Sequence, residues 1–433
     1  MFQLKQHNTT VKQEMLAGLT TFLTMAYIVV VNPIILSGAG VPIDQVFVAT
    51  IIAAVIGTFM MGLFANYPIA IAPGMGLNAY FTSAVVIGSN GNIDYLTAFS
   101  AVFVAGIIFV ILSLTPLREK LIASIPENLK LAITAGIGLF IAFIGLRMSG
   151  LVVAHESNLV GLGDLRSESV ILTLIGLAVT IILMSRNVNG ALFIGMIITG
   201  VIAFFTGNLK IDGVVAIPHL PEGILVWNPI DAIGDVISYG LYGVVFSFIL
   251  VTLFDTTGTM IGVAKQAGLM KDGKLKNARA ALLADSVATT AGAMVGTSPT
   301  TAFIESSSGV AAGGRTGLTS VTVGVLFIIA SFFSPLVTSI SEVSAITSPA
   351  LIIVGSLMIS AVKDINWNGI DEAFPAFLVI LTMPLTSSIS TGIALGFISY
   401  PLLKLAKGKA REVHPLLYVF AVLFFIQLVF LPH

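Results

Sequence analysis

The sequence contains no cysteine, and charged residues make up only 9% of its 433 residues. Without cysteine there are no disulfides, and the five histidines show no metal-ligand spacing, so a metal site is not expected. A formal net charge of −1 argues against a nucleic-acid partner. The sequence has no phosphate-binding loop, catalytic triad or dinucleotide motif. An enzyme is therefore not predicted.

Hydrophobic residues make up 56% of the sequence. A soluble domain has about 25% charged residues, and a membrane-spanning helix needs about 20 apolar residues. The sequence therefore predicts an all-α polytopic membrane protein with 14 transmembrane segments. The expected spans are 14–38, 43–64, 69–88, 93–115, 129–148, 169–184, 188–206, 237–262, 278–296, 297–312, 317–338, 345–362, 371–386 and 388–406. A further apolar segment, 413–431, either crosses the membrane or lies in its interface.

The loop charges orient these spans. The acidic and histidine-containing loop 149–168 is predicted to lie outside. Basic residues cluster in the other loops, and cytoplasmic loops are enriched in Lys and Arg, so the N-terminus is predicted to be cytoplasmic. The basic residues are Arg118, Lys120, Lys265, Lys271, Lys274, Lys276, Arg279, Arg315, Lys404, Lys407, Lys409 and Arg411.

The segment GTSPTTAFIESSSGVAAGG (296–314) is unusually polar for its apolar surroundings, because 12 of its 19 residues are Gly, Ser, Thr or Pro. In hydrocarbon nothing would satisfy such a backbone, so non-helical segments at membrane depth are buried in protein or line a cavity. A similar segment, YPIAIAPGMGLNAYF (67–81), also places a proline before small residues that open a helix. Short extended stretches are therefore predicted in spans 3 and 10.

These two segments are each third in a set of seven spans, and the Pro- and Gly-rich linker 207–236 separates the sets. Because seven is odd, the second set enters the membrane from the opposite face, which makes a 7+7 inverted repeat. Paired interruptions at matching positions indicate a binding site near the membrane midplane. The half-helix N-termini there carry partial positive charge.

Three polar residues are the first candidates for this site. Asp255 lies near the middle of span eight, where a carboxylate either binds substrate or protons or is held by local Ser, Thr or backbone groups. Glu305 opens the half-helix of span ten, where it serves a ligand, caps the helix, or does both. Asn78 is the corresponding residue of span three, with an amide that either contacts the ligand or caps its helix.

Further candidates surround these three. Asp285, in span nine, is either a member of a proton relay or a structural residue bonded to Ser or Thr across helices. Thr256 and Ser306 are candidates for substrate contact, although such residues in membrane helices usually serve packing or backbone bonding. Pro73 and Pro299 are expected to be architectural, each placed ahead of a half-helix.

The motifs GLTTFLTMAYIVVVNP (18–33), NYPIAIAPGMGLNAYF (66–81), LFDTTGTMIGVAKQAGL (253–269) and GTSPTTAFIESSSGVAAGGRTGLT (296–319) resemble the azaguanine-transporter-like purine permeases. These are nucleobase–cation symporters related to uracil and xanthine permeases, and the resemblance covers essentially the whole chain. It implies a core domain (14–115 and 237–338) and a gate domain (129–206 and 345–406). The final segment 413–431 exceeds this plan.

The resemblance implies proton-coupled uptake of guanine, hypoxanthine or adenine, with guanine and hypoxanthine favoured, across a bacterial cytoplasmic membrane. The family's substrate carboxylates correspond to Asp255 and Glu305, and its third-span amide corresponds to Asn78. No cofactor is expected beyond the co-transported proton, and sodium remains an alternative coupling ion. Members of the wider group often form dimers through the gate domain, so a homodimer is a further expectation.

Three other classes of protein are alternatives. An anion transporter of the sulfate-permease type shares the seven-plus-seven plan, but its site has no anionic residue facing the substrate, whereas this chain has two carboxylates. A membrane-embedded enzyme needs a nucleophile–base pair or a metal cluster, and neither is visible. A channel does not need two matched interrupted segments.

Overall fold

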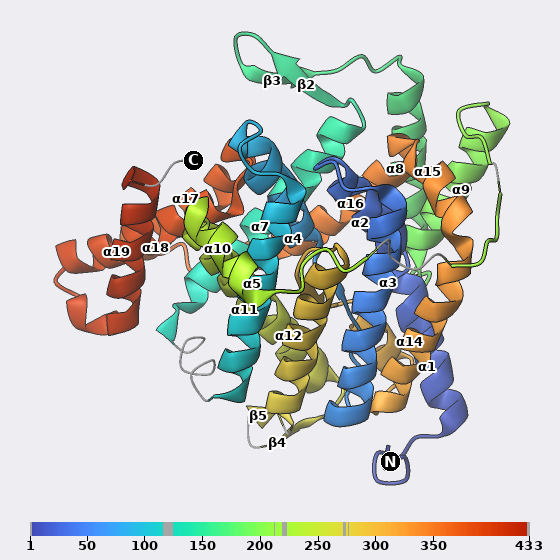
Figure 1. The fold of residues 1–433 in the computed structure, drawn as a ribbon, viewed down its shortest axis with the longest axis horizontal. Helices are drawn as coiled ribbons and strands as arrows, with labels where there is room; N and C mark the ends of the chain where they lie inside the picture. Colours follow the sequence, from blue (N-terminus) through green and yellow to red (C-terminus); the bar gives the residue numbers. More distant parts are fainter. Residues whose placement is uncertain are drawn as a thin grey trace.

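The computed structural model describes residues 2–115, 124–211, 213–218, 223–271, 274–275 and 277–430. Arg118, Lys120 and Lys276, which contributed to the loop-charge prediction, lie outside these residues. Within the described part, nine helical segments are long and apolar enough to cross a membrane, and two shorter apolar helices accompany them. The structure is mostly helical, as the sequence predicts (Figure 1).

The first half of the chain follows the predicted spans closely. Its elements are α1 (Val11–Met25), α2 (Ile28–Ser37), α3 (Ile43–Met60), η1 (Met61–Ala65), β1 (Ile71–Pro73), α4 (Met75–Tyr80), η2 (Phe81–Val86), η3 (Ile87–Ser89), α5 (Tyr95–Leu114), α7 (Glu127–Met148), β2 (Val152–His155), β3 (Leu159–Leu162), α8 (Glu168–Ser185) and α9 (Ala191–Phe205).

The second half of the chain follows the linker. Its elements are α10 (Pro229–Ser238), α11 (Tyr242–Gln266), β4 (Met270–Lys271), β5 (Lys274–Leu275), α12 (Ala278–Val295), β6 (Thr300–Ala302), α13 (Ser306–Ala311), α14 (Gly317–Ala330), η4 (Ser331–Phe333), α15 (Ser334–Ser341), α16 (Ser344–Ile359), η5 (Ser360–Asp364), α17 (Ile370–Thr386), α18 (Ile389–Ala406), η6 (Ala410–Glu412) and α19 (Pro415–Phe430).

Two predicted continuous spans are interrupted in the structure. The span predicted at 14–38 is divided into α1 and α2 at Ala26 and Tyr27, ahead of Pro33. The span predicted at 317–338 is divided into α14 and α15 by the short helix η4, just before Pro335. A proline lacks an N–H and crowds the carbonyl four residues earlier, which for Pro335 is that of Ser331, the first residue of η4.

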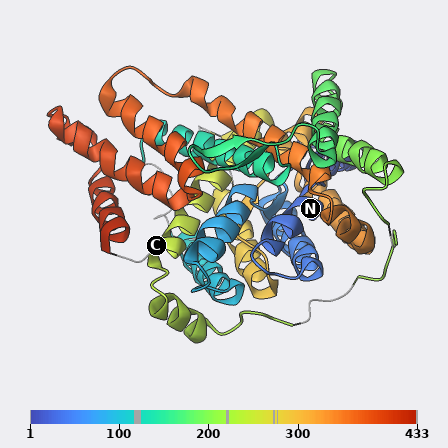
Figure 2. The same ribbon diagram turned by 90° about the horizontal axis from the view of Figure 1, so that it is seen from above.

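The linker and the outer loop contain structure that the sequence analysis did not predict. The last part of the linker forms α10, which buries Ala232 and Val236 against α5, and Asp235 accepts a hydrogen bond of 2.7 Å from the hydroxyl of Ser100. The loop 149–168 contains the β2–β3 hairpin. Figure 2 shows the described parts of the linker between α9 and α10 running along the periphery of the molecule.

The two halves of the chain pack against each other. α12 packs between α3 and α5, α1 packs against α14, and α7 packs against α16 and α17. In Figure 2 the blue and cyan helices of the first half alternate with the yellow helices of the second. Figure 1 shows the N-terminus and the β4–β5 hairpin at one end, and the β2–β3 hairpin at the opposite end.

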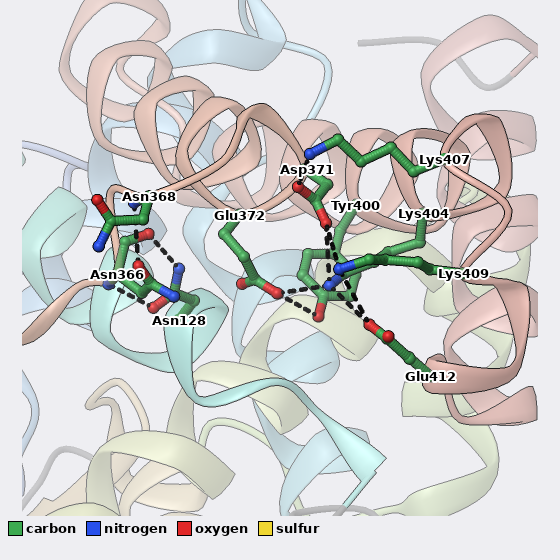
Figure 3. A network of polar contacts seen from close by, with 10 residues as sticks. All are labelled: Asn128, Asn366, Asn368, Asp371, Glu372, Tyr400, Lys404, Lys407, Lys409 and Glu412. Atoms are coloured by element: carbon green, nitrogen blue, oxygen red, sulfur yellow. Dashed lines mark hydrogen bonds and ion pairs between the residues drawn. The ribbon is translucent and has the colours of Figure 1, made fainter.

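An ionic cluster ties the ends of α17 and α18 to the segment that leads into α19 (Figure 3). The ammonium group of Lys404, a buried residue, lies 2.8 Å from a carboxylate oxygen of Glu372, and 3.2 Å from one of Asp371 and one of Glu412. Buried charges need such partners, because an unpaired ion loses its hydration. The described part of the segment predicted at 413–431 contains the helix α19, which packs against α18.

Candidate functional site

The two predicted extended stretches pair with each other. β1 and β6 form an antiparallel ladder with Ile71 opposite Ala302, Ala72 opposite Thr301 and Pro73 opposite Thr300. The pairing continues at both ends, through Gly74 N to the Pro299 carbonyl and Phe303 N to the Ala70 carbonyl, each at 3.0 Å. All six strand residues are buried. The backbone of each strand therefore finds in the other strand the hydrogen-bond partners that apolar surroundings cannot provide. The prediction of extended stretches is confirmed.

Each strand leads into a short helix. β1 is followed by Gly74, the N-cap of α4, and β6 by a turn that ends at Glu305, the N-cap of α13. Pro73 is the last residue of β1 and Pro299 immediately precedes β6. Both prolines therefore belong to the strand pair, ahead of the half-helices.

Glu305 is partly exposed, and its carboxylate accepts a hydrogen bond from Tyr27, with 2.5 Å between Oε1 and the hydroxyl oxygen. Tyr27 lies between α1 and α2 and is fully buried. Although Glu305 occupies the N-cap position, its side chain makes no capping hydrogen bond to α13. The carboxylate contacts the first span instead.

Asp255 lies on α11 and is also partly exposed. It is within hydrogen-bonding reach of the side chain of Thr301, the middle residue of β6, and it interacts electrostatically with Glu305. The structure therefore brings the two candidate carboxylates close to β6, one from α11 and one from the start of α13. Both residues are partly exposed in a region where most polar side chains are buried.

Asn78 is fully buried within α4, so it is not a cap of that helix. Its carbonyl oxygen Oδ1 accepts a hydrogen bond from the hydroxyl of Ser298, while its amide nitrogen Nδ2 has no partner among the described residues. A buried donor without a partner costs about 1–3 kcal/mol. The amide therefore offers a fixed donor beside the strand pair.

The hydroxyls of Thr256 and Ser306 bind the strands themselves. Thr256 Oγ1 accepts from Ala302 N at 3.3 Å, and Ser306 Oγ accepts from Ala70 N at 3.0 Å. These contacts use edge donors that the two-stranded ladder leaves unpaired. In this structure both side chains support the site through the backbone.

Asp285 also contacts a strand residue. The hydroxyl of Thr300 lies 3.0 Å from both Oδ1 and the carbonyl oxygen of Asp285, and Thr289 on the same helix contacts Thr300 at 2.9 Å. Asp285 is fully buried on α12. This arrangement matches the structural alternative considered for this residue.

No group of three His, Cys, Asp or Glu side chains that would hold a metal ion occurs in the described ranges. The sequence analysis missed Tyr27, Ser298 and Thr301, the three side chains that contact Glu305, Asn78 and Asp255. Ser298 and Thr301 lie in the polar segment 296–314, which was a usable signal. Tyr27 is one aromatic residue in an apolar run, and its position alone did not distinguish it.

The sequence matches a known family across most of its length. A family model described as "Permease family" (Xan_ur_permease) matches residues 12–395. The chain belongs to this permease family. It is 69% identical over 429 residues to the guanine/hypoxanthine permease PbuO of Bacillus subtilis (strain 168), covering 99% of both proteins. It is 44% identical over 432 residues to the adenine permease AdeP of Escherichia coli (strain K12), covering 100% of this chain and 96% of that one.

The fold of the permease also has solved neighbours. The transmembrane domain of the cyanobacterial bicarbonate transporter BicA matches with a TM-score of 0.67 at 14% identity, covering 88% of this chain and 97% of that one. At this identity the likeness concerns the fold alone. The permease is therefore a multi-pass membrane transporter and not an enzyme, and its relatives include purine nucleobase permeases.

Proposed function

We propose that this permease takes up purine nucleobases, guanine and hypoxanthine in preference to adenine, by proton-coupled alternating access. The observation that carries the proposal is the 69% identity to the guanine/hypoxanthine permease PbuO over 99% of both chains. The site geometry supports it, because two partly exposed acidic residues and an amide nitrogen without a partner among the described residues lie beside the strand pair.

The chemistry of a purine fits these groups. Guanine presents N1–H and an exocyclic amine on one edge, and a carboxylate accepts from both in a charge-assisted pair. Its O6 and N7 are acceptors, for which the free Nδ2 of Asn78 is a matching donor. In this proposal Asp255, Glu305 and Asn78 contact the purine, and Thr256 and Ser306 complete the site.

A carboxylate that is not occupied by the purine carries the proton. Neutralising it lowers the cost of moving the loaded site between the two sides of the membrane. Asp255 and Glu305 are the first candidates and Asp285 the third. Because a sodium ion would neutralise the same charge, the sodium dependence of uptake is measured alongside.

We further propose that the fold has 14 spans in two inverted repeats of seven. The core domain (14–115 and 237–338) would hold the site, and the gate domain (129–206 and 345–406) would move against it. The antiparallel pairing of β1 with β6, which hold matching positions in the two halves, supports this symmetry. So does the packing of α7 against α16, α17 and α18 as a separate group.

The permease is proposed to lie in a bacterial cytoplasmic membrane with its N-terminus inside, and to form a homodimer through the gate domain. The orientation draws support from the shared location of the N-terminus and the β4–β5 hairpin at one end, where Lys265 and Arg279 flank that hairpin (Figure 1).

Uptake in cells that lack their own purine permeases tests the function. We expect accumulation of radiolabelled guanine and hypoxanthine, weaker accumulation of adenine, and none of xanthine or uracil. A protonophore should abolish accumulation, whereas removal of sodium should not. Accumulation that survives the protonophore would refute proton coupling.

The same assay tests the residues. Asp255→Asn and Glu305→Gln keep the side-chain shape but remove the charge, and each should lower purine uptake at least tenfold, on the order of one charge-assisted hydrogen bond. The matched control is Glu127→Gln, an exposed glutamate at the start of α7. Normal uptake by both site variants would show that the residue assignment is wrong.

A further inference from the structure

The first membrane span changes its helical geometry beside the site. At the junction of α1 and α2, Val29 N bonds to the Ala26 carbonyl at 3.2 Å and Val30 N to the Tyr27 carbonyl at 3.1 Å, which are tighter i→i+3 bonds. Such a turn within a longer helix often marks a functional position. It turns the side chain of Tyr27 toward the start of α13.

The contact between these elements is polar and partly buried. The Tyr27 hydroxyl lies 2.5 Å from Oε1 of Glu305, and the Thr24 hydroxyl lies 3.4 Å from the Glu305 carbonyl oxygen. In the described part of the chain, no other side chain hydrogen-bonds the Glu305 carboxylate. Tyr27 therefore restrains the direction in which the Glu305 carboxylate points.

We propose that Tyr27 is a positioning and specificity-determining residue for the purine, acting through Glu305; this rests on the function proposed above. A phenol that donates to a carboxylate stabilises its ionised form, which only accepts hydrogen bonds. The titratable groups that face Glu305 are Tyr27, from the first span, and Asp255, from α11. An ionised Asp255 only accepts hydrogen bonds, so of these two groups Tyr27 is the one that donates to Glu305.

An acceptor at this position distinguishes between purines. Guanine and hypoxanthine carry a proton on N1 and donate to it, whereas the N1 of adenine is itself an acceptor. A carboxylate oxygen that Tyr27 holds in place as an acceptor therefore favours guanine and hypoxanthine and opposes adenine. Without the phenol, the carboxylate loses the contact that fixes its direction, so it discriminates less between these purines.

The test is Tyr27→Phe, which removes only the hydroxyl. We expect normal membrane expression, a KM for guanine raised roughly tenfold with little change in the maximal rate, and a guanine-to-adenine uptake ratio reduced by a similar factor. The matched control is Tyr400→Phe. Its hydroxyl also donates to a carboxylate, that of Glu372 at 3.1 Å, but at the ends of α17 and α18 and away from the strand pair. This control should leave the KM and the ratio unchanged.

A double-variant cycle separates this inference from the proposed function. If Tyr27 acts through Glu305, Tyr27→Phe has no further effect on the ratio in a Glu305→Gln background, and a full additional effect there would overturn the proposal. The proposal would also be overturned if Tyr27→Phe left the KM for guanine and the guanine-to-adenine uptake ratio unchanged while Glu305→Gln impaired uptake. That result would not contradict the proposed purine uptake. Absence of purine uptake by the unmodified permease would instead refute the proposed function.

Discussion

Replacing the buried Glu14 by alanine should lower the free energy of unfolding of the permease more than replacing a charged residue on its surface. Glu14 lies in the first turn of α1 and is fully buried. Its carboxylate accepts hydrogen bonds from Arg315 N at 3.0 Å, Thr316 N at 3.2 Å and the Thr319 hydroxyl at 2.5 Å. These donors surround the start of α14, where a helix leaves its first N–H groups without partners in its own backbone.

The magnitude follows from the number of donors left unpaired. Each buried donor without a partner costs about 1–3 kcal/mol. Arg315 is only partly buried, and a hydroxyl can rotate to another acceptor, so we expect a total loss of roughly 3–5 kcal/mol. Glu14→Gln keeps one accepting oxygen, so its loss should be smaller, about 1–2 kcal/mol.

Thermal unfolding of the purified permease in detergent measures this effect. Globular proteins unfold with an entropy of about 2.1 cal/mol/K per residue, so 3–5 kcal/mol corresponds to a fall in Tm of roughly 3–6 °C for a chain of this size. The control is Glu127→Ala, also in the first turn of a helix. Its side chain is 75% exposed and pairs only with Lys130, so Tm should stay within about 1 °C. Equal shifts for the two variants would refute the reasoning.

Three further variants test the site and its support. Ser298→Ala removes the hydroxyl that donates to the Asn78 side-chain oxygen. The KM for guanine should rise roughly fivefold, on the order of one neutral hydrogen bond, while Tm changes little. An unchanged KM would contradict this positioning role. Gly317→Ala would drive a methyl group into the backbone that ends the second span and should abolish folded expression, whereas Gly258→Ala on α11 meets open space and should be tolerated. Asp285→Asn keeps an oxygen that accepts from the β6 hydroxyl, so accumulation sensitive to a protonophore should persist; its loss would instead assign Asp285 to the proton path.

The sequence was sufficient to locate most of the helices and the two extended stretches, because each leaves a local signal. Apolar runs of spanning length predict membrane helices, and the polar segment 296–314 contains β6 and α13. The boundaries of the predicted spans accordingly agree with most helices to within a few residues. The inner structure of the linker was missed because α10 is short and half polar.

The contacts of the site were beyond a single sequence. The Tyr27–Glu305 and Glu14–Thr316 contacts each join residues on opposite halves of the chain, and nothing local distinguishes Tyr27 from a packing aromatic or Glu14 from a polar terminus. Asp285 shows the opposite limitation. Its residue type allowed both a relay and a structural bond, with the structural bond preferred, and the contact with Thr300 is of the structural kind.

The pairing of β1 with β6 has a consequence for the biogenesis of the permease. When β1 is synthesised, the strand that will pair with it lies more than two hundred residues further along the chain. Its backbone groups cannot be satisfied by lipid in the meantime. The segment that contains β1 therefore needs water or an insertion factor around it until the second half is made. A first half produced on its own would be expected to stay sensitive to proteases until the second half is added.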